Sequence, residues 1–172
     1  MTKQNKIILL ALLTALGSIL FIIENFVQLP ILWFRLGLAN MMTLLALKWW
    51  GLKEGMSVLL LRVLIGSLLS GRFLSPLFVM AIGGGITSTI LMWSLFHVKN
   101  DFFGLIGISI LGALAKNITQ IFIAYVTYIN QIELFRVIPF LIITSLVTGF
   151  IIGFLTILFD SRLNKSFQIH LF

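Results

Sequence analysis

The stretch IILLALLTALGSILFIIENF, residues 7–26, contains a single charged side chain, Glu24. A helix needs about 20 predominantly apolar residues to cross the hydrocarbon core of a bilayer, and this stretch supplies them. Together with the preceding basic residues, MTKQNK, the stretch resembles a secretory signal peptide. Its apolar run is too long for a typical signal core and has no persuasive cleavage site, so we expect an uncleaved first transmembrane helix.

The rest of the chain continues this apolar character. Of its 172 residues, 60% are hydrophobic and 10% are charged, which is more apolar surface than a soluble domain of this size can bury. Six apolar segments follow one another: 7–26, 36–50, 55–71, 77–96, 103–128 and 135–159. The second and third are short, so we expect them to be tilted, partly re-entrant or sheltered by neighbours. The alternating pattern typical of membrane strands is missing. We therefore predict one all-α integral membrane domain over residues 1–172, with six transmembrane helices.

The basic residues between these segments predict the orientation of the chain. With the N-terminus inside the cell, the inner side holds seven of them: Lys3, Lys6, Lys48, Lys53, Lys99, Arg162 and Lys165. The outer side holds three: Arg35, Arg72 and Arg136. Because cytoplasmic connections carry an excess of Lys and Arg, we expect both termini in the cytoplasm, with Trp49 and Trp50 as an inner interfacial anchor. This placement accounts for the net charge of +7, so we expect no nucleic-acid partner.

Several classes of chemistry are disfavoured by the composition. Cysteine is absent, which excludes disulfides, thiolate metal sites and a cysteine nucleophile, and the two histidines are isolated. The five acidic residues are dispersed, so the chain lacks the aspartate-rich motif that holds magnesium and diphosphate in prenyl synthases. Neither a P-loop nor a nucleophile elbow is present. We therefore expect a protein that is not an enzyme, with no metal and no cofactor, surrounded by lipid.

Two basic residues, Arg62 and Lys116, lie near the centres of apolar segments. A Lys or Arg at the bilayer centre costs about 2.5 to 3.5 kcal/mol on translocon-based scales, so such residues need a polar partner, a cavity or an anionic ligand. Under the predicted topology, further polar residues lie at a similar depth, between the middle of the membrane and its outer surface: Glu24, Arg35, Asn40, Arg72, Asn117 and Gln120. The excess of positive charge predicts an outward-opening pocket for a small anionic ligand, bound by Arg and Lys and oriented by the amides.

Structural alternatives exist for each of these residues. Glu24 and Arg35 can pair with each other, and Arg35 and Arg72 can extend to the membrane interface. Arg62 can be tied to backbone carbonyls at a helix break. On the fifth segment, Lys116, Asn117 and Gln120 follow helical spacing on one face, which predicts contact with protein or a cavity rather than lipid.

Small residues at four-residue spacing form a second pattern. Ala11 and Ala15 give A-x-x-x-A on the first segment, a spacing that allows close approach of another helix, either a partner's or one of this chain. Gly149 and Gly153 on the sixth segment favour packing within the chain. Residues 83–85 are three consecutive glycines without the Lys and Ser/Thr of a P-loop, so they predict a kink or a packing site.

Three stretches carry a family resemblance: FRLGLANMMTLLAL at 34–47, LLRVLIGSLLSGRFLSP at 60–76 and GALAKNITQ at 112–120. In this order and spacing they resemble the Gx transporter family, often labelled heptaprenyl diphosphate synthase component I, over nearly the whole chain. Members commonly have A-H-N-x-x-Q in the fifth helix. Here Asn117 and Gln120 match, whereas Lys116 replaces the histidine. This departure speaks against a histidine-dependent proton role and adds positive charge to the predicted pocket.

The resemblance extends to the substrate-binding S components of energy-coupling factor transporters, six-helix proteins that capture micronutrients from outside. It implies a bacterial cytoplasmic membrane and a partnership with a transmembrane coupling protein and two ATPases. An A-x-x-x-A motif in the first helix contacts the coupling protein in that group, and Ala11 and Ala15 match its position. Two alternatives remain open: a non-catalytic membrane accessory of heptaprenyl diphosphate or quinone biosynthesis, and a membrane component of flavin-based extracellular electron transfer.

Overall fold

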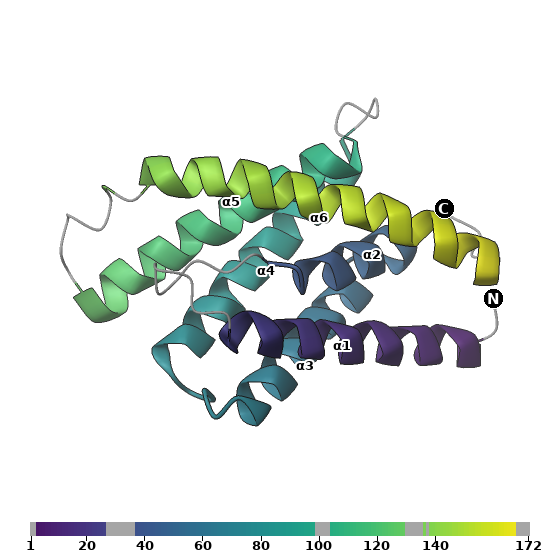
Figure 1. Ribbon diagram of the computed structural model, residues 1–172, viewed down its shortest axis with the longest axis horizontal. Coiled ribbons are helices and arrows are strands. Elements are labelled where there is room, and N and C mark those ends of the chain that lie inside the picture. The colour runs from purple at the N-terminus through teal and green to yellow at the C-terminus, as the bar shows by residue number, and fades with distance from the viewer. Residues whose placement is uncertain (1–2, 27–36, 99–103, 130–135, 137, 168–172) are drawn as a thin grey trace.

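Helices make up every regular element in the described part of the chain. The computed structural model describes residues 3–26, 37–98, 104–129, 136 and 138–167. The helices are α1 (Lys3–Phe26), α2 (Asn40–Trp50), α3 (Leu52–Leu69), α4 (Pro76–Phe96), α5 (Leu105–Ala124) and α6 (Ile138–Phe167), and the π-helical turn η1 (Tyr125–Ile129) follows α5 directly (Figure 1). A helix lies in each of the six predicted segments, which confirms the all-α prediction.

Four of these helices are long and apolar enough to cross a membrane. They cover Lys3–Glu24, Pro76–Phe96, Leu105–Thr127 and Ile138–Leu163, so the chain is a multi-pass membrane protein. The prediction of six spans is not supported. With eleven residues, α2 is about 16 Å long, roughly half the thickness of the hydrocarbon core. Helix α3 has eighteen residues but carries Lys53, Glu54 and Arg62.

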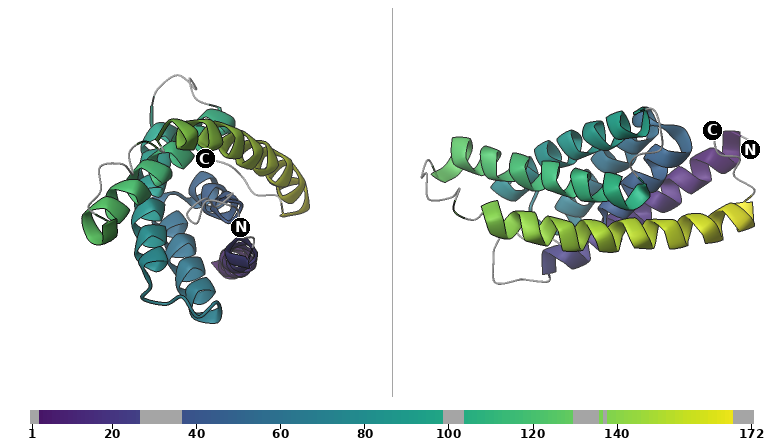
Figure 2. Two further views of the ribbon diagram at one scale, coloured as in Figure 1. Left: turned by 60° about the vertical axis from the view of Figure 1, so that its left-hand side comes forward. Right: turned by 90° about the horizontal axis from the view of Figure 1, so that it is seen from above.

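The short helix α2 lies at the centre of the molecule. Nine of its eleven residues are buried, and it packs against α1, α3, α4 and α6 (Figure 2). The largest described cluster of buried apolar side chains joins α1 and α2 and includes Leu9, Leu13, Leu45 and Trp49. A helix that cannot span the bilayer is thus sheltered by its neighbours, as expected for the second segment.

Local signals explain how the central helices are joined. Gly51 separates α2 from α3 with a φ of 93°, a left-handed backbone conformation that side chains other than glycine rarely adopt. At the start of α4, the Ser75 hydroxyl accepts a hydrogen bond from the Phe78 N–H at 3.3 Å, and Pro76 occupies the first helical position. These signals fix where α2 ends and where α3 and α4 begin.

Glycines allow the longer helices to approach closely. A Cβ added at Gly149 would lie 2.5 Å from the Ile110 Cα, and one at Gly153 would lie 2.6 Å from the Ile106 Cα, so α5 and α6 cross with their backbones in contact. In α4, Gly84 packs on α5 and Gly85 packs on Leu59 of α3. The packing predicted for both glycine groups is confirmed, and α4 runs through residues 83–85 as one continuous helix.

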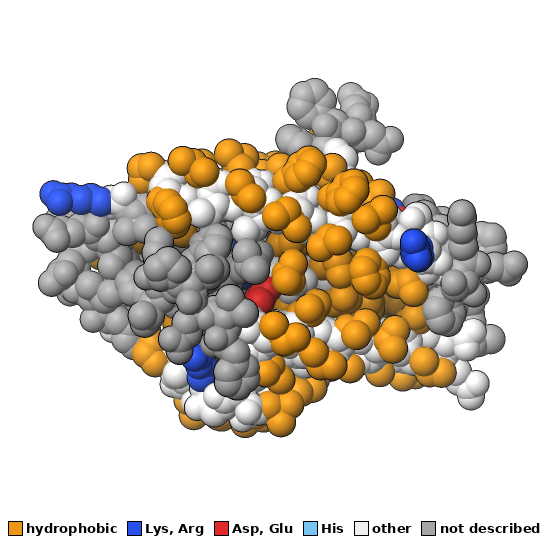
Figure 3. Space-filling model, in the orientation of Figure 1, with side chains coloured by type: hydrophobic (Ala, Val, Ile, Leu, Met, Phe, Trp, Pro, Cys, Tyr) orange, Lys and Arg blue, Asp and Glu red, His pale blue; other side chains and the backbone are white. Residues whose placement is uncertain are grey.

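The outer surface matches a lipid environment. Hydrophobic side chains spread along the face built by α6 and α1, and most basic side chains visible on that face lie toward its ends (Figure 3). Leucine, isoleucine, valine and phenylalanine side chains are exposed along the same two helices, among them Ile8, Ile23, Ile143 and Val147. Such a surface is too apolar for a water-soluble protein and is what the bilayer core favours.

Candidate functional site

Arg62 on α3 is buried, and its guanidinium is bonded to the first turn of α2. Its Nε donates to the Thr43 hydroxyl at 3.1 Å and its Nη2 donates to the Asn40 side-chain oxygen at 3.2 Å. Both partners are themselves buried. In these two bonds the acceptors are side chains of a neighbouring helix. The alternative in which backbone carbonyls at a helix break hold Arg62 stays a prediction. The hydroxyl of Thr43 and the amide of Asn40 therefore help to orient the Arg62 guanidinium.

The stem of Arg62 packs against α1. A Cβ added at Gly17 would lie 3.1 Å from the Arg62 Cδ, so glycine leaves the space that the arginine side chain occupies. One turn further along α3, the Phe21 ring fills the space beside Gly66, where an added Cβ would lie 2.5 Å from the Phe21 Cδ1. The glycines of this interface thus bring α1 and α3 together around a buried cation.

Glu24 lies at the same end of α2 as this cation. Its carboxylate accepts a hydrogen bond from the Ala39 N–H at 3.3 Å, at the position that precedes the helix. The N-terminus of a helix carries a partial positive charge, which stabilises a buried carboxylate there. Glu24, Asn40 and Arg62 therefore gather around the start of α2, as the sequence predicts. The predicted partner Arg35 lies outside the described residues, and so does the suggested Glu24–Arg35 pair.

Lys116 and Gln120 on α5 face α4. A Cβ added at Gly84 would lie 3.2 Å from the Lys116 Cγ and 2.9 Å from the Gln120 Cγ, so both side chains pass directly over this glycine. The Gln120 amide donates to the Met80 carbonyl at 3.5 Å and is buried, whereas Lys116 is half-buried. The predicted polar stripe of α5 thus faces protein.

Asn117 takes a different direction from its neighbours. Its side-chain nitrogen donates to the Ser145 hydroxyl of α6 at 2.7 Å, and that hydroxyl donates to the Leu141 carbonyl at 2.6 Å. The contacts above join Arg62 to α1 and α2, Lys116 to α4 and Asn117 to α6. One pocket that contains both Arg62 and Lys116 stays a prediction.

Arg72 lies in the turn between α3 and α4. Its carbonyl accepts from the Ser75 hydroxyl at 2.6 Å, and its N–H donates to the Ser67 carbonyl at 2.9 Å. The side chain is half-buried. The backbone of this turn is therefore well fixed, and Leu74 within it adopts a positive φ of 59°, which is unusual for a leucine. A ligand role for Arg72 stays a prediction.

Ala11 and Ala15 line an apolar groove of about 620 Å³ between α1 and α3. Both alanines are exposed, and so are Leu61 and Ile65 on the facing wall. Packing within the chain therefore does not account for the A-x-x-x-A pattern, in contrast to Gly149 and Gly153, which are covered by α5.

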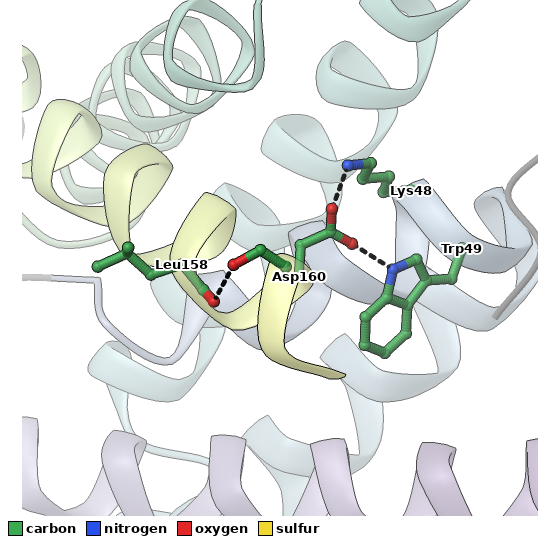
Figure 4. A network of polar contacts seen from close by, with 5 residues as sticks. Lys48, Trp49, Leu158 and Asp160 are labelled. Carbon is green, nitrogen blue, oxygen red and sulfur yellow. Dashed lines mark hydrogen bonds and ion pairs between the residues drawn. The ribbon is translucent and has the colours of Figure 1, made fainter. Parts of the chain in front are cut away.

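A polar network at the other end of α2 was not anticipated from the sequence. Asp160 of α6 accepts from the Lys48 Nζ at 2.6 Å and from the Trp49 indole nitrogen at 2.7 Å (Figure 4). Trp49 is only 2% exposed, so its predicted place in an interfacial anchor is wrong: the ring belongs to the core. The one sequence signal for this network is a lone aspartate that follows the apolar run of α6.

A second ion pair lies at the start of α3, where Lys6 of α1 donates to Glu54 at 2.5 Å. Partial burial acts to raise the pKa of Glu54. The hydrogen bond from Lys6 and the charges of Lys6 and Lys53 outweigh it and hold the pKa below its ordinary value. In the described residues, no group of three His, Asp or Glu side chains could hold a metal ion.

These features define the class: a multi-pass, all-helical membrane protein. It has a polar cluster around one buried arginine (the Arg62 cluster: Glu24, Asn40, Thr43 and Arg62) and an apolar groove between α1 and α3. A family model described as "Heptaprenyl diphosphate synthase component I" matches residues 13–159. The match covers most of the chain, so the protein belongs to this family. Comparisons with curated proteins and with solved structures gave no match.

Proposed function

We propose that the protein is the substrate-binding membrane component of an energy-coupling factor type importer in a bacterial cytoplasmic membrane. It would capture a small anionic solute from the outer face and catalyse no reaction itself. Energy would come from a transmembrane coupling protein and ATPase subunits. In this proposal all six helices form an S-component-like bundle with both termini in the cytoplasm, and α2 and α3 are embedded by their neighbours.

The exposure of Ala11 and Ala15 carries the proposal. Small residues at other helix crossings make contacts within the chain: Gly17 accommodates Arg62, and Gly149 is covered by α5. Only small side chains allow two membrane helices to approach backbone to backbone. Two exposed alanines one turn apart on α1 therefore favour docking of a helix from a partner, for which the coupling protein is the candidate.

The solute site would be built around Arg62. Its guanidinium is oriented by Asn40 and Thr43, and a charged group held in this way loses little further entropy when an anion binds. Glu24 offsets part of the positive charge at this helix end. Net attraction for an anion therefore depends on Lys116, with Asn117 and Gln120 as hydrogen-bonding groups and Arg35 and Arg72 at the rim.

Co-purification tests the docking surface. Membranes of the native host would be solubilised in mild detergent, and the tagged chain isolated as wild type, as A11W/A15W and as I90W/V147W. The last pair is the matched control, because Ile90 and Val147 are exposed on α4 and α6. We expect a coupling protein and ATPases with wild type and control, and their loss with A11W/A15W. Equal recovery from all three would overturn the docking surface.

The family description favours a second candidate: a non-catalytic membrane accessory of heptaprenyl diphosphate or quinone biosynthesis. The same purification separates the two, since this candidate predicts a soluble prenyl synthase subunit in the isolate and no coupling protein. Recovery of that subunit alone would replace the importer by the accessory. Uptake of solute by cells that express the chain with the coupling subunits, and its loss in R62M, would support the importer.

A further inference from the structure

The groove between α1 and α3 is apolar along its whole length. Its walls are mainly Ile, Leu, Val and Ala side chains, together with three hydroxyl residues. Each hydroxyl is already bonded to a carbonyl of its own helix: Thr14 to Leu10, Ser18 to Thr14 and Ser57 to Lys53, all at 2.8 Å. The walls therefore offer an occupant apolar contact rather than hydrogen bonds, which suits a hydrocarbon chain.

The lining residues form two rows, one on each helix, at four-residue spacing. The row on α1 is Ile7, Ala11, Ala15 and Ile19, and the row on α3 is Ser57, Leu61, Ile65 and Leu69. Helical residues four apart lie above one another, so the next position of each row continues the same wall. These positions are Lys3 and Lys53.

Both lysines lie at the same end of the groove. Lys6 of α1 bonds Glu54 of α3, and this pair ties the two walls together beside Lys3 and Lys53. Three lysines and one glutamate leave two net positive charges there, and the side chains of Lys3 and Lys53 are exposed. At the opposite end the lining residues are Ile22 and Leu69, which are apolar. From Lys53 to Leu69 the wall is about 24 Å long at 1.5 Å per residue.

We propose that this groove binds one anionic, single-chain amphiphile. The chain would lie along the groove between α1 and α3, and a phosphate or carboxylate head would sit between Lys3 and Lys53. A volume of about 620 Å³ is in the range that holds one small-molecule-sized ligand, which favours one chain over two. Basic side chains at a membrane surface attract anionic head groups, and a protein helix in the groove would not need them.

This site is separate from the Arg62 cluster and does not depend on the importer proposal. The site has one consequence for the importer proposal. An amphiphile in the groove contacts Ala11 and Ala15, so the amphiphile and a partner helix exclude each other. A bound amphiphile would therefore compete with assembly.

Native mass spectrometry of the purified full-length chain tests the site without any partner protein. The delipidated protein in a neutral detergent is titrated with hexadecyl phosphate, and with hexadecanol as the uncharged probe. We compare wild type with K3Q/K53Q and with R162Q/K165Q, a control that removes two charges from the same end of the molecule. We expect an apparent Kd for hexadecyl phosphate about tenfold higher in K3Q/K53Q and within about twofold of wild type in the control.

A second variant tests the chain-binding part. A15W fills the groove from its α1 wall and should abolish binding of both probes, whereas I90W, an exposed position on α4, should leave binding unchanged. Equal affinity for hexadecanol, equal weakening in both double variants, or unchanged binding in A15W would overturn the proposal. Tighter binding of dioleoyl phosphatidylglycerol than of hexadecyl phosphate would replace the single-chain occupant by a bilayer lipid. Failure of the importer test leaves all these outcomes unaffected.

Discussion

The crossing of α5 and α6 depends on the absence of two Cβ atoms, which makes it the most direct test of the packing. In G149A the new methyl group would lie 2.5 Å from the Ile110 Cα and 3.0 Å from the Ile110 nitrogen. In G153A it would lie 2.6 Å from the Ile106 Cα. Ordinary contacts begin at about 3.4 Å, so the helices must separate by about 1 Å.

The size of the stability loss depends on which atoms the new methyl group clashes with. Overpacking costs about 1–3 kcal/mol, and a backbone atom cannot rotate away as a side chain can. Alanine has the higher helix propensity, so replacing glycine stabilises each helix by up to about 1 kcal/mol and offsets part of this cost. We therefore expect a loss of about 1–2 kcal/mol of unfolding free energy for each variant. The double variant G149A/G153A should lose less than the sum of the two, because one separation of the helices relieves both clashes.

Unfolding in mixed micelles with increasing dodecyl sulfate, followed by far-ultraviolet circular dichroism, measures this loss. The matched control is G83A, which is also in a helix but clashes with the flexible tip of the Ile123 side chain, its Cδ1 atom, rather than with backbone. It should change stability by less than about 1 kcal/mol. Trimming the facing side chain in I110A should not rescue G149A, since the clash is with the main chain. Equal stability of G149A/G153A and G83A would refute the close crossing.

Three further outcomes follow from the polar contacts. R62M keeps the stem that packs on α1 but leaves Asn40 and Thr43 without their donor, so we expect a loss of about 1–3 kcal/mol in the same unfolding assay; unchanged stability would mean that these bonds do not hold the fold. D160N removes the negative charge that faces Lys48 and should cost about 1–3 kcal/mol, with a changed tryptophan emission; wild-type emission and stability would contradict the network in Figure 4. Because the pKa of Glu54 is lowered on folding, its contribution to stability is present above its ordinary pKa of 4.5 and is lost as the pH falls through the folded value. In E54Q, the unfolding free energy should therefore change less with pH in the acidic range than in wild type, and at neutral pH the loss should be less than about 1 kcal/mol. An unchanged pH dependence in the acidic range would refute this role.

The helices could be predicted because length and apolar content decide them locally. The six segments predicted from the sequence correspond to α1–α6, with shifts of up to four residues at most ends and of eight residues at the end of α6. The number of spans could not be predicted in the same way. Apolar residues such as Leu44 and Leu45 read the same whether lipid or protein covers them, and only the packed bundle shows that α2 is covered by protein.

The candidate site was predicted in part. Depth under the predicted topology grouped Glu24, Asn40 and Arg62, and in the structure the Glu24 carboxylate and the Arg62 guanidinium both reach the start of α2. The sequence could not show that Thr43 is an acceptor, since threonine in an apolar segment usually bonds its own helix. Nor could it pair Asp160 with Lys48, because 112 positions separate them and local rules do not reach across the bundle.

The difference between the central helices and the four long ones has a consequence for biosynthesis. A helix such as α1 is long and apolar enough to enter the bilayer as it leaves the ribosome. Helix α2 is too short to do so, and α3 brings a buried cation that donates hydrogen bonds to side chains of α2. We expect these two to become stably embedded only when α4 and α6, made later, provide the other walls around them. We therefore expect truncated chains that end before α6 to be held by membrane chaperones, and quality control of this protein to monitor its last helix.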